Sequence, residues 1–306
     1  MTLTPHRELR YYLFALRTGL ANLRTSRFRL GVRKTIGRIA QPIHGPTRFP
    51  EYYWFECAIQ AHLATLSPGW RATVLDVGSP KMFGMYLALH AEAALTLTDI
   101  NDADVDEYRM MWSSRAAEAK RPVVFARQEV RSLAYADDAF DIVYAMSVVE
   151  HVDGEDGDSR GVRELLRVLK PGGLLVLSVP YGASYAEQAR IGFAHASHKT
   201  GDRAACFFQR IYDRQALEKR ILGSLPELAH VEFTTVLRRN LGLGRTFGSL
   251  SETVRGMLGV LNPVVSMAIN RSCAGLCEPR PAQYGPLHNA GDMYEDVILV
   301  GRKARV

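Results

Sequence analysis

The chain has few cysteines and no long apolar run. Its 306 residues contain four scattered cysteines, Cys57, Cys206, Cys273 and Cys277. Four are too few for a disulfide framework, and the close pair lacks the second pair that a zinc site needs. No apolar run approaches the roughly 20 residues of a membrane span, and the start lacks the apolar core of an export signal. We expect a cytoplasmic protein with incidental thiols and no metal site.

Acidic residues are nearly missing from the first 50 positions. That segment has ten Lys or Arg and one acid, Glu8, whereas the remainder has 28 basic and 31 acidic residues. The formal net charge of +6 therefore originates in the N-terminal segment.

The basic segment also has helical periodicity. Leucines recur at three- and four-residue steps and arginines every seven residues, which predicts an amphipathic helix. Such a helix can pack its leucines on the protein's own core, or lie on an anionic membrane. Nucleic acid is a weaker alternative, because arginines without interleaved aromatic residues specify little. The residues concerned are Leu9, Leu13, Leu16, Leu20 and Leu23, with Arg10, Arg17 and Arg24.

Prolines and a glycine then predict a linker, at Pro42, Gly45, Pro46 and Pro50. We expect residues 1–48 to be a basic amphipathic arm and residues 49–306 to be the folded domain. Its segment at about 240–290 reads as an insertion with a strongly apolar stretch, 257–269. That stretch suits a lid over an apolar or lipid-linked acceptor, a homodimer contact, or ordinary core packing.

Strand-like and helix-like segments alternate in the domain. Such alternation predicts a doubly wound α/β fold: a Rossmann-like, mostly parallel sheet with helices on both faces and its ligand at the carboxyl ends of the strands. The expected strands are 72–77, 95–99, 123–125, 142–146 and 174–179, and the expected helices are 51–66, 82–90, 104–120 and 160–169.

The first strand leads into a turn with too few glycines for a dinucleotide site. Residues 75–84 read LDVGSPKMFG, with Pro80 and Met82 where further glycines would form a phosphate cradle. Gly78 still permits close approach of a ligand. Asp99, at the end of the second strand, can accept both hydroxyls of a ribose. Taken alone, this glycine and acid would also fit dehydrogenases.

Three later segments narrow the choice. They are 128–143 (QEVRSLAYADDAFDIV), 147–152 (SVVEHV) and 163–173 (RELLRVLKPGG). With the first turn they make four ordered motifs, and the chain resembles class I S-adenosylmethionine-dependent methyltransferases of the small-molecule, type-11-like group. The likeness is close over about 72–182 and looser to 236. It implies S-adenosylmethionine as cofactor and a seven-stranded sheet whose last strand, 296–300, is antiparallel at the sheet edge.

The resemblance assigns roles around the cofactor. Asp76 would hold the methionine amino group, with the Met146 carbonyl as a second acceptor, and Asp99 would bind the ribose. Glu129 would reach the adenine amino group in place of the usual Asp, and the Val130 amide would face the ring. The remaining expected cofactor contacts are Gly78, Ser79, Pro80, Ile100 and Ser147.

A proton acceptor is needed if the methylated atom is a hydroxyl oxygen, which we expect. Histidine suits that step because its pKa lies near neutrality. His151 follows the fourth strand and is the first candidate. His198, with His195, lies in the expected loop after the fifth strand. The segment after strand four lacks the Asn/Asp-Pro-Pro-aromatic signature of enzymes that methylate nucleobase amines, so nucleic acid is not the expected acceptor.

Two alternatives stay open. A catalytically inactive methyltransferase-like binding module would keep the fold without the reaction. A NAD-dependent dehydrogenase is disfavoured because the turn lacks the pyrophosphate cradle. We expect the acceptor to be a small molecule, a lipid-linked compound or a saccharide, with peripheral membrane contact through residues 1–48.

Overall fold

The computed structural model describes residues 5–25, 48–191, 205–239, 280–281 and 292–305. The apolar stretch 257–269 and nearly all of the expected insertion lie outside these ranges.

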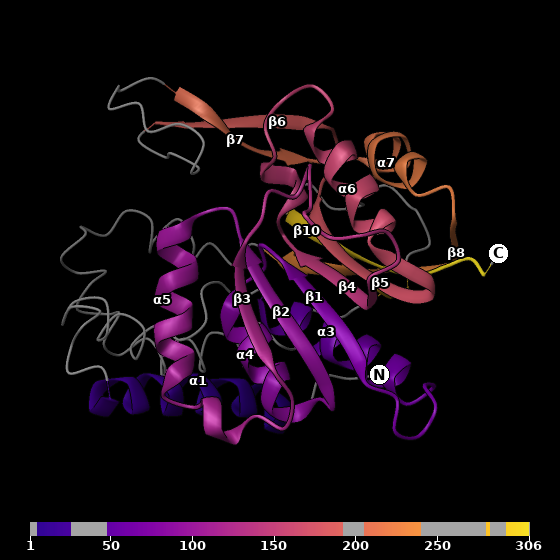
Figure 1. Ribbon diagram of the computed structural model, residues 1–306. Coiled ribbons are helices and arrows are strands. Elements are labelled where there is room, and N and C mark those ends of the chain that lie inside the picture. Colours follow the sequence, from indigo (N-terminus) through magenta and orange to yellow (C-terminus); the bar gives the residue numbers. More distant parts are fainter. Residues whose placement is uncertain (1–4, 26–47, 192–204, 240–279, 282–291, 306) are drawn as a thin grey trace.

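A single large sheet carries the fold (Figure 1). Its order is β3-β2-β1-β4-β5-β10-β8-β9, and the first five strands in this order pair in parallel. The strands are β1 (Ala72–Val77), β2 (Ala93–Asp99), β3 (Val123–Arg127), β4 (Phe140–Met146), β5 (Leu169–Tyr181), β8 (Leu228–Arg239), β9 (Arg280–Pro281) and β10 (Asp292–Lys303).

The last strand corrects one detail of the expectation. β10 is antiparallel to both β5 and β8, as predicted for the final strand. It lies between these two strands and not at the edge of the sheet, where the two-residue β9 stands. The predicted doubly wound α/β fold is confirmed.

Helices cover both faces of the sheet (Figure 1). One face is covered by α1 (Pro5–Thr25), α3 (Arg48–Leu63), α4 (Lys81–His90) and α5 (Asp102–Ser113). The other is covered by α6 (Gly157–Arg167) and η3 (Leu217–Ile221). Shorter turns are η1 (Ala116–Glu118), η2 (Val149–His151), α7 (Arg214–Ala216) and η4 (Leu222–Ser224).

Two apolar cores follow from strand alternation, because successive side chains point to opposite faces. Val74 and Tyr144 pack toward α3 and α4, whereas their neighbours Leu75 and Val143 pack toward α6. Central strands buried on both faces therefore read as nearly continuous apolar runs, as they do in parallel sheets generally.

Several element boundaries differ from the prediction. α5 ends at Ser113, well before the expected position 120. The hydroxyls of Ser113 and Ser114 donate to the carbonyls of Met110 and Met111, and such local bonds compete with helix continuation. β5 begins at Leu169 and not at 174, because Leu169 already pairs with Phe140 across an irregular register.

A two-stranded hairpin replaces part of the expected loop after the fifth strand. β6 (Ala186–Ile191) pairs antiparallel with β7 (Ala205–Ile211). Both strands are short and partly polar, so their period-two pattern is weak in sequence. The segment between them, with His195 and His198, lies outside the described residues.

The N-terminal helix is docked by its aromatic side. Tyr11, Phe14 and Ala15 are buried against α3 and α4. The Tyr11 hydroxyl donates to Glu56 of α3, and Arg115 donates to the Thr18 hydroxyl at 3.1 Å. Packing on the protein's own core, one of the arrangements that the sequence left open, is wrong for Leu13, Leu16 and Leu20.

Three leucines of this helix instead face outward. Leu13, Leu16 and Leu20 are 40%, 36% and 43% exposed. The aromatic side of the helix is the buried one because Tyr11 and Phe14 each pack edge to face against Tyr86 of α4. Periodicity alone identified the helix but not its buried side.

Candidate functional site

Polar residues gather at the carboxyl edge of the parallel strands. Val77 pairs with Thr98, and Asp99 pairs with Arg127, so the ends of β1, β2 and β3 lie side by side. The structure therefore brings Gly78, Asp99 and Glu129 to one edge of the sheet. Parallel α/β sheets bind their ligands at this edge.

The turn after β1 has the backbone that the sequence predicted, but a side chain faces it. Gly78 has a φ of 65°, and its amide donates to the Thr98 carbonyl at 2.9 Å. A Cβ at this position would lie 2.8 Å from Val148 Cγ1. The glycine is thus required by its conformation and by Val148, which lies where a ligand was expected to approach.

Ser79 and Pro80 connect this turn to its neighbours. The Ser79 amide donates to Asp76 Oδ1 at 3.0 Å, and its hydroxyl accepts from the Met146 amide at 2.9 Å. Pro80 precedes the first residue of α4, where a missing amide costs little. The proline that departs from the glycine pattern thus precedes the helix without removing a hydrogen bond within it.

Asp76 is fully buried near the end of β1, and both of its oxygens accept hydrogen bonds. Tyr144 donates to its Oδ2 at 3.0 Å, and Lys81 approaches its Oδ1 at 3.4 Å. Burial raises the pKa of Asp76 above its ordinary value, although the Lys81 ammonium, the Tyr144 hydroxyl and the Ser79 amide oppose that rise.

Lys81 is a residue that sequence reasoning missed. It is 1% exposed, yet its ammonium contacts three oxygens: the Ser79 carbonyl at 2.5 Å, Asp76 Oδ1 at 3.4 Å and Asp99 Oδ2 at 3.8 Å. A lysine in the turn could have been weighed as a partner for the two acids. It precedes the expected helix 82–90 and was given no role.

Asp99 is the more accessible of these two acids, with its side chain 20% exposed. Its Oδ1 accepts from the Asn101 amide at 3.1 Å, and Arg127 donates to the Ile100 carbonyl at 3.0 Å. Asp99 does not cap α5, because the Asn101 side chain accepts from the Ala103 amide there. Its Oδ2 remains directed toward Lys81.

Glu129 is held by a neighbouring arginine. Arg131 donates to both carboxylate oxygens at 3.0 Å. Burial alone would raise the pKa of Glu129, but the hydrogen bonds from Arg131 outweigh it and hold that pKa below its ordinary value. Val130 is buried in the core beside Gly161. The carboxylate is therefore charged and oriented at the end of β3.

Met146 and Ser147 end β4 in a hydrogen-bonded cluster with α3. Ser147 has a φ of 51°, and its hydroxyl donates to Glu51 Oε1 at 3.1 Å and accepts from Arg48 at 2.7 Å. Ser178 of β5 also donates to Glu51, at 2.7 Å. Arg48 and Glu51 come from the segment that the sequence assigned to the linker and first helix, so their role here was not predicted.

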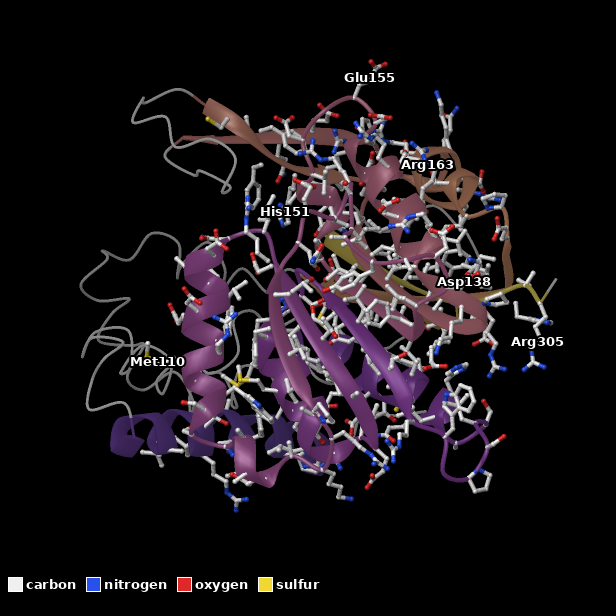
Figure 2. The ribbon with its side chains drawn as sticks, in the orientation of Figure 1. Met110, Asp138, His151, Glu155, Arg163 and Arg305 are labelled. Carbon is white, nitrogen blue, oxygen red and sulfur yellow. The ribbon has the colours of Figure 1, made fainter. Side chains whose placement is uncertain are left out.

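His151 ends the short η2 turn beneath the hairpin. Figure 2 places it between the sheet and β6–β7. Its Nδ1 lies 2.7 Å from the Phe208 carbonyl, so that nitrogen carries the hydrogen, because a carbonyl can only accept. Because Nδ1 carries the hydrogen of the neutral ring, the lone pair is on Nε2. This nitrogen lies 3.7 Å from Glu150 Oε1.

Glu150 is a buried acid that sequence reasoning also missed. It is 1% exposed, and within the described part of the chain its Oε2 has no hydrogen-bond partner. Burial raises the pKa of Glu150 well above its ordinary value, with Asp296 and Glu51 adding to the rise and Arg48 opposing it. A buried, unpaired carboxyl oxygen favours the protonated form.

A hollow of about 380 Å³ lies elsewhere on the molecule. Its lining includes Asp138, Arg163 and Lys303, and Figure 2 labels the first two. Asp138 precedes β4 and Lys303 ends the antiparallel β10, so the hollow is at the amino edge of the parallel strands. It is not the expected ligand edge.

No helix within the described ranges is long and apolar enough to cross a membrane. Within the same ranges, no group of three or more His, Cys, Asp or Glu side chains is arranged to hold a metal ion.

Comparison with known proteins matches the central part of the chain. Residues 75–177 match the family model described as a methyltransferase domain. An uncharacterized methyltransferase of Mycobacterium tuberculosis (strain ATCC 25177 / H37Ra) is 33% identical over 149 residues, 47% of this chain and 52% of the relative. One of Mycobacterium leprae (strain TN) is 32% identical over 150 residues, 47% of this chain and 49% of the relative. The chain spans about half the length of these curated relatives.

Among solved structures, a SAM-dependent methyltransferase from Methanosarcina mazei is similar with 14% identity and a TM-score of 0.46. The match covers 81% of this chain and 97% of the other.

Proposed function

Since the chain belongs, through its central domain, to the class I S-adenosylmethionine-dependent methyltransferases, we propose that it transfers a methyl group from this cofactor to an acceptor oxygen. The observation that carries the proposal is the gathering of Gly78, Asp99 and Glu129 on adjacent strand ends. When bound, the cofactor would supply a sulfonium-activated methyl group, which an acceptor oxygen attacks in line while the sulfur leaves as a neutral thioether. The domain's own contribution is alignment and removal of a proton.

The residues at the edge fit an adenosine with an amino-acid tail. Asp99 is partly exposed and has an oxygen free of backbone partners for ribose hydroxyls. The charged Glu129 can accept from the adenine amino group. Asp76 offers a carboxylate to the amino group, provided that Lys81 yields its place.

His151 is the proposed proton acceptor. Its Nδ1 hydrogen is held by the Phe208 carbonyl, so the Nε2 lone pair is the basic position. The buried Glu150 lies beside it, with Oε1 3.7 Å from Nε2.

Incorporation of labelled methyl groups into fractionated cell extract tests the reaction. We expect label in a lipid, saccharide or small-molecule pool, with the rate reduced about 100-fold by His151→Gln. His90→Gln is the matched control, because His90 lies on α4 and is exposed. Label with unchanged rate in His151→Gln would remove the histidine from the mechanism, and absence of label in every pool would contradict the reaction.

A lipid surface is the proposed place of the acceptor. The outward row Leu13, Leu16 and Leu20 lies on a helix that is fixed to the body through Tyr11 and Thr18. The exposed Arg10 and Arg17 flank this row. Burying a leucine contributes roughly 1.5–3 kcal/mol, and each arginine near anionic lipid contributes about 1 kcal/mol. The row therefore suits an anionic bilayer surface.

Vesicle flotation tests this surface. The protein should float with vesicles that contain anionic phospholipid and not with zwitterionic ones. A triple variant, Leu13→Gln with Leu16→Gln and Leu20→Gln, should stay behind while remaining folded, because these side chains are exposed. Val124→Gln, at an exposed valine of β3, is the control and should float. Equal flotation of the triple variant and the unaltered protein would refute the proposal. It would also be refuted if the unaltered protein does not float but forms a dimer that the triple variant abolishes.

A further inference from the structure

We propose that Lys81 is a built-in competitor for the cofactor's amino group, and that this lysine sets the protein's discrimination between adenosine ligands with and without an amino-acid tail. The inference rests on the proposed function, and its starting point is the burial of the lysine. Its side chain is 1% exposed, at the first position of α4.

The ammonium lies where a ligand's ammonium is expected. It is 3.4 Å from Asp76 Oδ1 and 3.8 Å from Asp99 Oδ2, with the Ser79 carbonyl at 2.5 Å. It therefore bridges the two carboxylates expected to hold the tail and the ribose. A primary ammonium with three donors and oxygen partners is the same chemical group as the amino end of the cofactor.

Neither oxygen of Asp76 is without a donor, so a second ammonium would have to share the carboxylate with Lys81. Its Oδ2 accepts from Tyr144, and its Oδ1 accepts from the Ser79 amide as well as from Lys81. Of these donors, the lysine is the longest contact and ends a flexible four-carbon stem. The other two are a backbone amide and a ring hydroxyl fixed by packing in the core. Lys81 is the donor that can leave.

The exchange balances charge within the buried site. While Lys81 holds Asp76, the carboxylate has its partner, and an incoming ammonium must first displace it. Without the lysine, the buried carboxylate lacks a partner, which is costly. A ligand that brings an ammonium then restores the pair, whereas a ligand without one does not.

Paired ligands isolate this effect. S-adenosylhomocysteine carries the amino-acid tail, and 5′-methylthioadenosine shares the nucleoside and sulfur but lacks that tail. In Lys81→Met we expect S-adenosylhomocysteine to bind about tenfold tighter or more, the scale of one hydrogen bond to a charged group. Binding of 5′-methylthioadenosine should change less than about twofold, because the ammonium is 3.8 Å from Asp99 Oδ2, beyond hydrogen-bond distance of the acid expected to hold the ribose. Calorimetric titration measures both.

Thermal unfolding supplies a second readout. Lys81→Met should lower the melting temperature of the free protein, and S-adenosylhomocysteine should restore more of it than 5′-methylthioadenosine does. Lys81→Arg keeps the charge and should show no gain in affinity. Lys81→Gln serves if the methionine variant does not fold. Adding Asp76→Asn to Lys81→Met should abolish the difference between the ligands.

The outcomes separate the two proposals. If both ligands bind the unaltered protein and Lys81→Met leaves their affinity ratio unchanged, or weakens S-adenosylhomocysteine, the competitor role is refuted and the proposed function stands. If neither ligand binds any form, the proposed function is refuted and the competitor role falls with it.

Discussion

Single residues decide how charge is arranged beneath the hairpin. Glu150 is buried next to His151, and its raised pKa means that the folded protein binds its proton more tightly than the unfolded chain does. The contribution of this group to the free energy of unfolding is therefore fully present below the ordinary pKa of glutamate. It is lost as the pH rises through the folded-state pKa.

Glu150→Gln should remove this pH dependence. As the pH rises above about 4.3, the ordinary pKa of glutamate, the free energy of unfolding of the variant should exceed that of the unaltered protein by a growing margin. The margin should grow by up to about 1.4 kcal/mol per pH unit until the folded-state pKa is passed. Urea unfolding at a series of pH values measures it. Glu155→Gln, at an exposed loop position, should show a flat difference, and a flat difference in Glu150→Gln would contradict the account.

At the scale of elements, one buried acid joins α6 to the segment after the hairpin. Asp158 accepts two hydrogen bonds from Arg220, at 2.8 and 2.7 Å, and one from the Tyr212 hydroxyl at 2.9 Å. The buried Arg210 donates to the Val152 carbonyl at 2.5 Å and to that of Gly154. These contacts fix the loop that follows His151.

Asp158→Asn should destabilise the protein by about 3–5 kcal/mol, because it removes the charge of a fully buried carboxylate that pairs with Arg220 at 2.7 Å and lies 3.9 Å from the buried Arg210. Asp156→Asn is the matched control. Asp156 is two residues away and forms an exposed ion pair with Arg163, with 3.6 Å between the charged atoms. Losing this ion pair should cost less than about 1 kcal/mol of stability. Chemical denaturation at pH 7 compares the two variants. Equal effects would show that the buried cluster contributes no more than a surface pair.

Elements with strong apolar patterns were predictable from sequence. β1 matches its predicted bounds, and β4 and α4 were recognised, because buried strands and helices leave continuous or periodic apolar signals. The β6–β7 hairpin was missed because its strands are short and partly polar. The outward side of α1 stayed open in the sequence, because periodicity identifies an apolar face but not what that face contacts.

The candidate site was predictable as a set of strand ends but not as a set of contacts. Spacing placed Asp99 at this edge and the family resemblance added Asp76 and Glu129, and the sheet register brings the ends of β1, β2 and β3 together. Lys81 contacts the two aspartates, Arg131 binds Glu129, and Val148 packs against Gly78. Such side-chain contacts cannot be deduced from spacing in the sequence. The cofactor roles of the predicted residues stay predictions.

The family resemblance is confirmed by the match of residues 75–177 to a methyltransferase domain. Part of its motif is structural: Asp141 of the Phe-Asp-x-Val segment accepts from the Thr73 amide at 2.9 Å and pairs with Lys170 at 3.0 Å. This acid ties β1 to β4 at the amino edge. Family motifs here therefore mark both the fold and the ligand edge.

At the scale of the whole molecule, the central claim is that the carboxyl edge binds an adenosine through Asp99. Calorimetric titration of the full chain with S-adenosylhomocysteine, repeated on Asp99→Asn, tests it most directly. We predict one site in the unaltered protein and an affinity about tenfold or more lower in the variant, because ribose hydroxyls lose a charged acceptor. Binding that is unchanged in Asp99→Asn, or missing from the unaltered protein, would contradict the account.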